Sequence, residues 1–278
     1  MPLVKMTEVL SWAEENNCAA GAFSVGNMEM IIGAVRAAEE MNTPIILQIA
    51  EKRLAQSPMH LMAPMMVSAA KNAKVPVAVH LDHGLTMDCI VSALEYGFTS
   101  VMLDASLLPF EENIELTKKV RALADKYGAT VEAELGVVGG NEGDTAEHKI
   151  TCTDPENAFE FCEKTGVDCL AVAIGNAHGN YPVSPELRFD VLEEICKKVS
   201  KPLVLHGGTG ITDEMFRKAI SLGIRKINIA TASFDALAKK AKVYTETADK
   251  PDYFKLSPYM ADAVYGNVKK HIEIFLNK

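Results

Sequence analysis

The stretch of sequence that decides the fold of this chain is Val77-Ala78-Val79-His80-Leu81-Asp82-His83-Gly84. It begins as an apolar run with β-branched residues, which predicts a strand buried on both faces. It ends in Asp82, His83 and Gly84, which a purely structural strand has little reason to place together. This ending predicts a functional site at the carboxyl end of the strand.

Two later apolar runs end in the same way. The run at residues 170–179 finishes in the pair His178-Gly179, and the run at residues 202–210 contains the pair His206-Gly207. Three predicted strands therefore each end in a His-Gly pair. This repetition indicates that the three strand ends serve one common purpose.

Strand-like and helix-like segments alternate along the whole chain. The predicted strands cover residues 21–24, 44–49, 77–80, 99–103, 130–134, 169–173, 203–206 and 226–229. The clearest helices, with apolar residues three and four apart, cover residues 28–41, 112–127, 187–199 and 213–222. This alternation favours a (β/α)₈ barrel that forms a single domain over residues 1–278. An open doubly wound sheet is the alternative, but its GxGxxG turn after the first strand is missing.

Two segments are longer than a tight connection between a strand and a helix. Residues 136–150 and residues 245–255 are predicted to be loops that move or cover a substrate. A last helix is predicted over residues 258–276.

The composition disfavours several classes of protein. A net charge of -9 disfavours a non-specific partner such as nucleic acid or an anionic membrane. No apolar run reaches the roughly 18 residues that a membrane span needs, and the N-terminus does not resemble a signal peptide. The six cysteines form no CxxC pair, which indicates free thiols in a reducing cytoplasm.

In a barrel of this kind the carboxyl ends of all strands surround one mouth, where active sites lie. Polar residues collect at these predicted ends, namely Asp82, His83, Asp104, Glu134, His178, His206, Asn228 and Thr231. A single histidine at a strand end is more often a hydrogen-bonded structural residue. Three histidines at equivalent ends instead favour a Zn²⁺ site with an open coordination position.

The carboxylates near these histidines have more than one possible role. Asp82 is predicted to exchange a proton with a substrate hydroxyl, or else to orient a histidine. Asp104 and Glu134 are predicted either to bind an alternative or second metal ion or to form internal salt bridges. His80 is expected to support a metal ligand or simply to be buried.

Two stretches predict a site for phosphate. The glycines of His206-Gly207-Gly208-Thr209-Gly210 allow backbone N–H groups to approach an anion ahead of the helix near Asp213. Asn228-Ile229-Ala230-Thr231 offers the same at the last strand. Such barrels usually hold phosphate in their seventh and eighth loops, although plain tight turns are the alternative.

Taken together, these residues resemble the class II, zinc-dependent fructose-bisphosphate aldolase family, including its tagatose-bisphosphate branch. The matching stretches follow the family's order over nearly the whole chain, at residues 79–84, 100–104, 109–114, 131–136, 139–140, 177–179, 206–210 and 228–231. The resemblance implies a lyase of carbohydrate metabolism, for example of glycolysis. Such an enzyme reversibly cleaves a ketose 1,6-bisphosphate of the fructose or tagatose type to dihydroxyacetone phosphate and an aldehyde such as glyceraldehyde 3-phosphate.

The resemblance also implies the cofactor and the assembly. The catalytic Zn²⁺ would be bound by His83, His178 and His206. Glu134 and Asp104 match metal-associated carboxylates, so a second metal position is open. The family pattern allows a Na⁺ or K⁺ ion near the substrate phosphate. It further implies a homodimer or homotetramer.

The same resemblance implies roles for the remaining site residues. Asp82 would exchange a proton with the C4 hydroxyl, and Glu142 would handle the proton on the dihydroxyacetone phosphate carbon. The phosphate of that ligand would be held by Gly179, Gly207, Gly208, Thr209, Asn228, Ile229, Ala230 and Thr231.

Some positions depart from the family's pattern. Ser24 stands where Asn is common, Ala50 where a Ser hydroxyl is usual, and residues 105–107 read Ala-Ser-Leu where Gly-Ser-His is typical. These positions lie towards the far half of the substrate, so the aldehyde product is predicted to differ from glyceraldehyde 3-phosphate. The substrate would then be another phosphorylated ketose or a deoxy-keto acid, whose anionic end meets Lys52 and Arg53 unless these are ordinary solvated charges.

Three other functions remain as alternatives. A Schiff-base aldolase needs a lysine that points into the mouth, whereas Lys226 comes early in its predicted strand. A metal-dependent hydrolase barrel usually carries a His-x-His pair on an early strand, which is absent here. A non-catalytic relative that binds sugar phosphates would bind Zn²⁺ without turnover.

Overall fold

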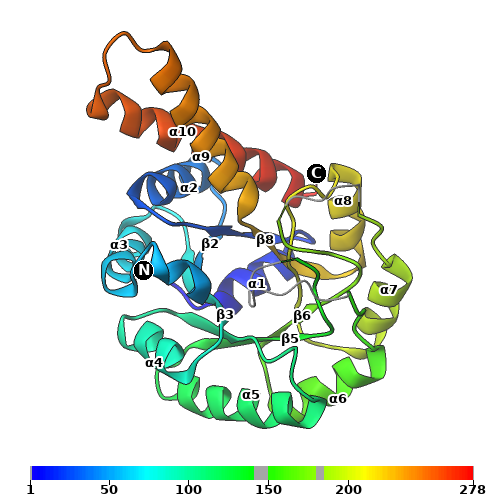
Figure 1. Cartoon of the computed structure of the whole chain (residues 1–278). Coiled ribbons are helices and arrows are strands. Elements are labelled where there is room, and N and C mark those ends of the chain that lie inside the picture. The colour runs from blue at the N-terminus through cyan, green and yellow to red at the C-terminus, as the bar shows by residue number, and fades with distance from the viewer. Residues whose placement is uncertain (1, 141–149, 180–184, 278) are drawn as a thin grey trace.

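In the structure, a computed structural model that describes residues 2–140, 150–179 and 185–277, eight parallel strands pair in chain order and close into a barrel (Figure 1). The strands are β1 Ala20–Ser24, β2 Ile45–Ala50, β3 Val77–Gly84, β4 Ser100–Leu103, β5 Thr130–Leu135, β6 Cys169–Val172, β7 Leu203–Leu205 and β8 Ile224–Ile229. Every strand residue is buried, because side chains fill the inside of the barrel and helices cover the outside. The predicted (β/α)₈ barrel is confirmed.

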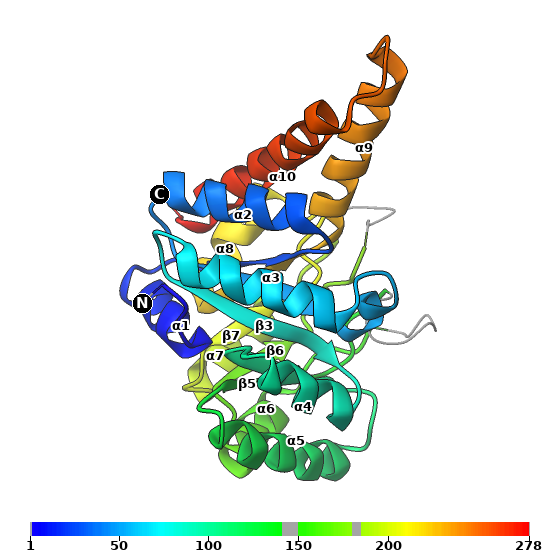
Figure 2. The same cartoon turned by 90° about the vertical axis from the view of Figure 1, so that its left-hand side faces the viewer.

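Helices connect the strands and form the outer ring (Figures 1 and 2). They are α1 Met6–Glu15, α2 Met28–Glu40, the short 3₁₀ helix η1 Glu51–Ala55, α3 Met59–Asn72, α4 Met87–Glu95, α5 Phe110–Asp125, α6 Pro155–Thr165, α7 Phe189–Lys198, α8 Asp213–Leu222, α9 Thr231–Thr247 and α10 Tyr253–Phe275. None of the helices in the described part of the chain combines the length and the apolar character that crossing a membrane requires.

The predicted last helix is confirmed, but its start and the extent of the loop before it are wrong. The sequence predicts a loop over residues 245–255 and a helix over residues 258–276, but α9 continues to Thr247 and α10 already begins at Tyr253. The side chain of Asp252 accepts a hydrogen bond from the backbone N–H of Phe254 and so caps α10. Pro258 therefore lies inside the helix. The other predicted loop falls largely on residues 141–149, outside the described residues.

The barrel interior changes from apolar to polar along its axis. α1 lies across the end opposite the mouth (Figure 2) and buries Met6, Val9, Leu10 and Ala13. These side chains pack against interior strand residues, which include Ala20, Ala22, Ile46, Ala78, Ala171 and Val204. Further along the same strand faces, the interior residues are Gln48, His80, Asp82, Glu132, Glu134, His206, Lys226 and Asn228. The charged and amide side chains thus gather towards the mouth, whereas the hydroxyls of Ser100 and Thr130 contact α1 at the other end.

Close backbone packing joins α2 to α10. A Cβ atom at Gly33 of α2 would lie 2.6 Å from Ala261 O, 2.8 Å from Val264 Cβ and 2.9 Å from Tyr265 N. Such distances are too short for non-bonded atoms, so glycine lets the two helices approach each other. This contact anchors the base of the α9–α10 extension to the barrel.

We predict that Gly33→Ala lowers the free energy of unfolding by about 1–3 kcal/mol, because the methyl group overpacks this seam. Gly266→Ala is the matched control, since Gly266 lies in α10 and an added Cβ would meet no atom within 4 Å. The control should raise stability by about 0.5–1 kcal/mol, because alanine loses less backbone entropy than glycine in a helix. Urea unfolding measures both, and equal effects of the two substitutions would contradict the proposed packing.

Candidate active site

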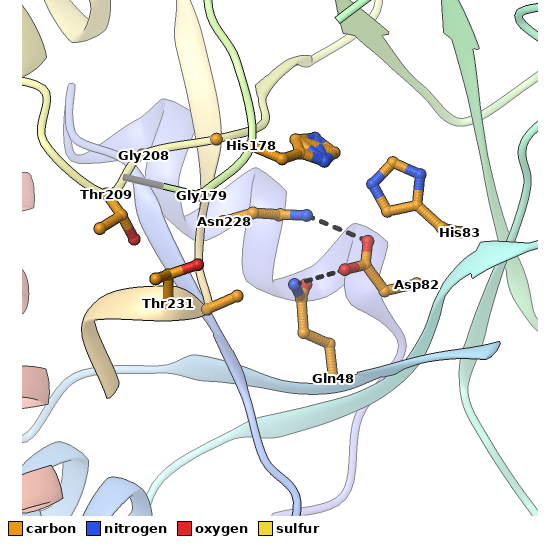
Figure 3. A pocket seen from close by; sticks show the side chains of 11 residues that line it. Gln48, Asp82, His83, His178, Gly179, Gly208, Thr209, Asn228 and Thr231 are labelled. Atoms are coloured by element: carbon orange, nitrogen blue, oxygen red, sulfur yellow. Dashed lines mark hydrogen bonds between the residues drawn. The ribbon is translucent and has the colours of Figure 1, made fainter. Parts of the chain in front are cut away.

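A pocket opens at the carboxyl ends of the strands (Figure 3). It is lined by Gln48, Asp82, His83, His178, Gly179, Gly207, Gly208, Thr209, Asn228, Ala230 and Thr231. These residues come from β2, β3, β8, the start of α9 and the loops after β6 and β7. Barrel closure therefore brings together residues that are far apart in the sequence.

Three histidines form one cluster in this pocket. The ring centroid of His83 lies 4.8 Å from that of His178 and 4.7 Å from that of His206, and the last two are 5.8 Å apart. One ring nitrogen from each histidine lies within 4.8 Å of the other two. The structure thus brings together the three histidines that the sequence proposes as ligands.

The end of β3 is irregular in a way that serves this cluster. By regular alternation, Asp82 points into the barrel and His83 points outward with Val79 and Leu81, which pack in the outer core. The register to β4 shifts between Leu81 and Gly84, and His83 has a φ of 42°. A bulge with a left-handed residue turns the His83 ring back towards the mouth. The strand also runs beyond the predicted residues 77–80, to Gly84.

Carboxylates orient two of the three rings. His83 Nδ1 lies 2.7 Å from Asp104 Oδ2, and His206 Nε2 lies 2.8 Å from Glu132 Oε1. Because an ionised carboxylate can only accept, each of these nitrogens carries the proton. The remaining nitrogens, His83 Nε2 and His206 Nδ1, then keep their lone pairs for another partner.

The site has unused electron pairs where a cation would bind. Among the described residues, His178 Nε2, His206 Nδ1 and Glu134 Oε2 are buried without a hydrogen-bond partner. His206 Nδ1 and Glu134 Oε2 lie 3.1 Å apart. Buried acceptors without donors are costly unless a cation or water satisfies them. Imidazole nitrogens also suit Zn²⁺, so the residues fit this metal.

The electrostatics of the metal-free site are dominated by the surrounding carboxylates. Burial lowers the pKa of His83, but Asp82 and Asp104 outweigh it and raise that pKa to about 10. Burial and the neighbouring histidines instead hold the pKa of His178 well below its ordinary value. The pKa of Glu134 is raised by burial and by the negative charge of Asp104. Without a metal ion, His83 therefore also holds a proton on Nε2, and a cation that binds there would take the place of this proton.

Asp104 and Glu134 also form a second group with His83. One ligand atom from each of these three residues lies within 4.8 Å of the others. Asp104 is in addition held by the backbone N–H and the hydroxyl of Ser106, at 3.2 and 2.7 Å. A second position for a metal, next to the three histidines, is therefore geometrically available.

Asp82 is held by two side-chain amides. Gln48 Nε2 donates to Asp82 Oδ2 at 2.8 Å, and Asn228 Nδ2 donates to Asp82 Oδ1 at 3.0 Å (Figure 3). Asp82 is only 3% exposed, yet it lines the pocket. A fixed, buried carboxylate beside a cluster of metal-binding type can exchange a proton with a hydroxyl group placed above it.

The sequence did not single out Gln48 and Glu132, although both contact proposed site residues. Alternation along the strands could have identified both. Gln48 lies two positions from the interior residue Ile46 in the otherwise apolar β2, and Glu132 lies two positions from Glu134 in β5. His80 is fully buried below the site, where its Nδ1 pairs with Ser100 Oγ at 2.8 Å. It lies beneath the cluster and is not part of it.

The proposed phosphate-binding residues surround one side of the pocket. α9 starts at Thr231, which lines the pocket, so the positive end of the helix dipole lies beside it. The Ala232 N–H donates to Thr209 Oγ1 at 3.1 Å and so ties the loop after β7 to this helix start. Gly179 and Gly207 have φ angles of 85° and 66°, and an added Cβ at Gly208 would lie 2.8 Å from Asn228 O. Ile229 does not line the pocket, because its side chain is buried in the core. Glu142 lies outside the described residues.

Comparison with known proteins gives a consistent result. Residues 4–278 match the family model described as "Fructose-bisphosphate aldolase class-II". The probable fructose-bisphosphate aldolase of Bacillus subtilis is 44% identical over 267 residues, which cover 95% of this chain and 93% of that protein. The fructose-bisphosphate aldolase of Staphylococcus epidermidis is 41% identical over 279 residues, covering 99% and 98%.

Solved structures agree with these sequence relatives. The crystal structure of the YdjI aldolase from Escherichia coli K12 superposes with a TM-score of 0.89 at 39% identity, covering 98% of this chain and 97% of that chain. The structure of a putative fructose-1,6-biphosphate aldolase from Coccidioides immitis gives a TM-score of 0.88 at 31% identity, covering 97% and 95%.

We predict that Gly207→Ala weakens zinc binding by about tenfold or more, because ligand orientation controls metal affinity. A Cβ atom at Gly207 would overlap Ala177 O and lie 3.1 Å from His178 N, and would therefore push apart the loops that carry His178 and His206. Gly166→Ala is the control, because Gly166 has nearly the same φ, 67°, with no atom within 4 Å of an added Cβ.

Both substitutions should destabilise the fold by about 1–2 kcal/mol, the cost of a left-handed alanine. Only Gly207→Ala should change the zinc dissociation constant, measured by competition with a chromophoric chelator. Equal zinc affinity in the two variants would show that the loop contact does not position the histidines.

Proposed function

Because this chain belongs to the class II fructose-bisphosphate aldolase family and is an aldehyde-lyase, we propose that it cleaves a phosphorylated ketose at a Zn²⁺ ion bound by His83, His178 and His206. The observation that carries the proposal is the convergence of three imidazoles, of which His178 Nε2 and His206 Nδ1 are buried without a hydrogen-bond partner among the described residues. The products would be dihydroxyacetone phosphate and an aldehyde, and the reaction would be reversible.

The reaction needs a base for the C4 hydroxyl and a group that returns a proton to C3. Asp82 takes the hydroxyl proton, the C3–C4 bond breaks and the aldehyde leaves, and Glu142 supplies the proton to C3. A Zn²⁺ ion, when bound, polarises the ketose carbonyl and stabilises the negative charge that develops on its oxygen. Gln48 and Asn228 keep the Asp82 carboxylate in place during the exchange.

The backbone of the pocket would hold the phosphate of the dihydroxyacetone half. Gly179, Gly207 and Gly208 allow close approach, and the first turn of α9 supplies N–H groups and the positive end of its dipole. This binding orients the substrate so that its C4 hydroxyl meets Asp82. A Na⁺ or K⁺ ion beside the phosphate would reduce the repulsion from the nearby carboxylates.

The far half of the substrate would extend into a second pocket next to the first. That pocket is lined by Gly26, Asn27, Met30, Arg53, Gln56, Ser57, Phe234 and Leu237. Both pockets are bounded by the start of α9, and the guanidinium of Arg53 lies 5.6 Å from the centre of the Phe234 ring. A cationic residue in this pocket supports a substrate with an anionic far end, either a phosphate or a carboxylate.

A Schiff-base mechanism is disfavoured by the surroundings of Lys226. Its Nζ is fully buried and lies 2.9 Å from Glu132 Oε2 and 2.7 Å from Asn228 Oδ1. A side chain enclosed in this way by Glu132 and Asn228 is not available to attack a carbonyl in the pocket.

The assembly would be a homodimer or homotetramer. α9 and α10 extend away from the barrel (Figures 1 and 2), and the first turn of α10 carries Tyr253 and Phe254, which are 59% and 85% exposed. Exposed aromatic residues on a projecting pair of helices support self-association. The six free cysteines support a cytoplasmic location, and a role in carbohydrate metabolism such as glycolysis follows from the proposed substrate.

We predict that the purified protein cleaves ketose 1,6-bisphosphates and that a chelator abolishes this activity until Zn²⁺ is restored. The measurement couples dihydroxyacetone phosphate formation to its reduction by NADH. Fructose and tagatose bisphosphates should be compared with ketose 1-phosphates that end in a hydroxyl or a carboxylate, in order to identify the far half. Turnover that survives chelation and is trapped by borohydride would contradict the metal mechanism, and zinc binding without any turnover would indicate a non-catalytic relative.

We also predict that Asp82→Asn lowers kcat by about 10²–10⁴-fold, the usual contribution of a positioned proton-transfer group. Zinc content should remain unchanged, because the metal nitrogens stay in place. Asp262→Asn is the matched control, since Asp262 pairs with Arg36 on an exposed surface and should leave kcat unchanged. If the loss of activity of Asp82→Asn followed a loss of zinc, Asp82 would be a support for the metal and not the base.

A further inference from the structure

Lys226 of β8 lies at the centre of a polar network below the pocket. The side chains of Lys226 and Glu132 are both fully buried. Lys226 Nζ lies 2.9 Å from Glu132 Oε2, 3.2 Å from Glu132 Oε1 and 2.7 Å from Asn228 Oδ1. One ammonium group thus contacts two residues that lead to different parts of the candidate active site.

The first branch leads to a proposed metal ligand. Glu132 Oε1 lies 2.8 Å from His206 Nε2 and, as an ionised carboxylate, can only accept. The proton of His206 is therefore fixed on Nε2, and Nδ1 keeps the lone pair that faces the pocket. Lys226 Nζ contacts both oxygens of Glu132, at 2.9 and 3.2 Å, and so holds the carboxylate in the position from which it meets His206.

The second branch leads to the proposed base. The amide of Asn228 could be placed in either of two orientations, but an ammonium group can only donate. Lys226 therefore fixes the oxygen of Asn228 towards itself and leaves the Asn228 NH₂ group to donate to Asp82 Oδ1, at 3.0 Å. The Asp82 carboxylate, which can only accept, favours the same orientation, so Lys226 and Asp82 hold the two ends of the Asn228 amide. Without Lys226, the amide oxygen would lose its donor and the amide would be held at its NH₂ end only.

We propose that Lys226 is a positioning residue that sets the metal ligand His206 and the base Asp82 together, without touching substrate or metal. The inference rests on the proposed function for the roles of these two residues. A buried ion pair is a poor source of stability compared with an apolar pair of similar volume. The role of Lys226 therefore lies in the two orientations that it fixes.

The test uses the full chain and replaces Lys226 by methionine, which keeps the length of the side chain but removes its charge and its donors. We expect zinc to bind about 10–100-fold more weakly, the usual effect of losing a group that orients a ligand. Competition with a chromophoric chelator measures this constant without substrate, and the visible spectrum of the Co²⁺-loaded protein reports the ligand geometry. At saturating zinc, kcat should fall while KM changes little, because the phosphate-binding backbone is untouched.

A double variant, Lys226→Met with Glu132→Gln, separates the two branches. It leaves no unpaired buried charge, and the carbonyl oxygen of the new amide at position 132 would still accept the hydrogen bond from His206. Zinc affinity should return towards the value of the unmodified protein, whereas kcat should remain low because Asn228 has lost its donor. Cys169→Ala is the control, since it removes only the weak hydrogen bond from Cys169 Sγ to Glu132 Oε2, at 3.7 Å, and leaves the contacts of Lys226 in place. It should change neither the zinc affinity nor kcat.

Unchanged zinc affinity and unchanged kcat in Lys226→Met, with only a lower melting temperature, would overturn the proposal. If Lys226→Met alone does not fold, the double variant decides, and a kcat equal to that of the unmodified protein would reject the role of Lys226. The zinc titration requires no turnover. A protein that binds zinc but has no activity would therefore contradict the proposed function. The effect of Lys226 on the zinc dissociation constant could still be measured in that protein.

Discussion

The ion pair between Lys226 and Glu132 crosses the inside of the barrel, from β8 to β5, where neither group reaches water. Charge in such a place is tolerated only when every partner is satisfied. The network therefore continues from Glu132 to His206 on one side and through Asn228 to Asp82 on the other. Because these strands are not neighbours in the sheet, the contacts across the interior fix the strand ends relative to each other more tightly than backbone pairing alone.

Much of the fold and of the site follows from local features of the sequence. Alternating strand and helix patterns predict the barrel. Because a closed barrel brings the carboxyl ends of all its strands to one mouth, the residues that end the strands are the candidates for the site. His83, His178 and His206 meet for this reason, although almost 100 residues separate the first two. The side chains that face the barrel interior are also predictable, since alternation along β3 places His80 and Asp82 on the same face.

Other features depend on contacts that a single strand does not reveal. The bulge that turns His83 inward is set by the register of β3 against β4, and alternation alone points this residue the wrong way. The position of Lys226 early in its strand suggested no role, because its partner Glu132 lies across the barrel and not beside it. The sequence places the start of α10 at Pro258, because proline is common in the first turn of a helix. In the structure the helix is capped by Asp252 and begins at Tyr253, so Pro258 lies in its second turn.

The two halves of the candidate site differ in how freely they can change. The proposed metal ligand His206 and Asp82 are tied to the buried network. The proposed phosphate half depends on backbone at glycines and at the start of α9, so a substitution there disturbs the core. The second pocket is formed by the loop before α2, by η1 and by side chains of α9, which buries only Ser233 along its length. Substitutions at such partly exposed positions usually alter stability by only about 0.5 kcal/mol. Under the proposed function, the second pocket is therefore the part of the site that can change most freely without disturbing the proposed metal ligands.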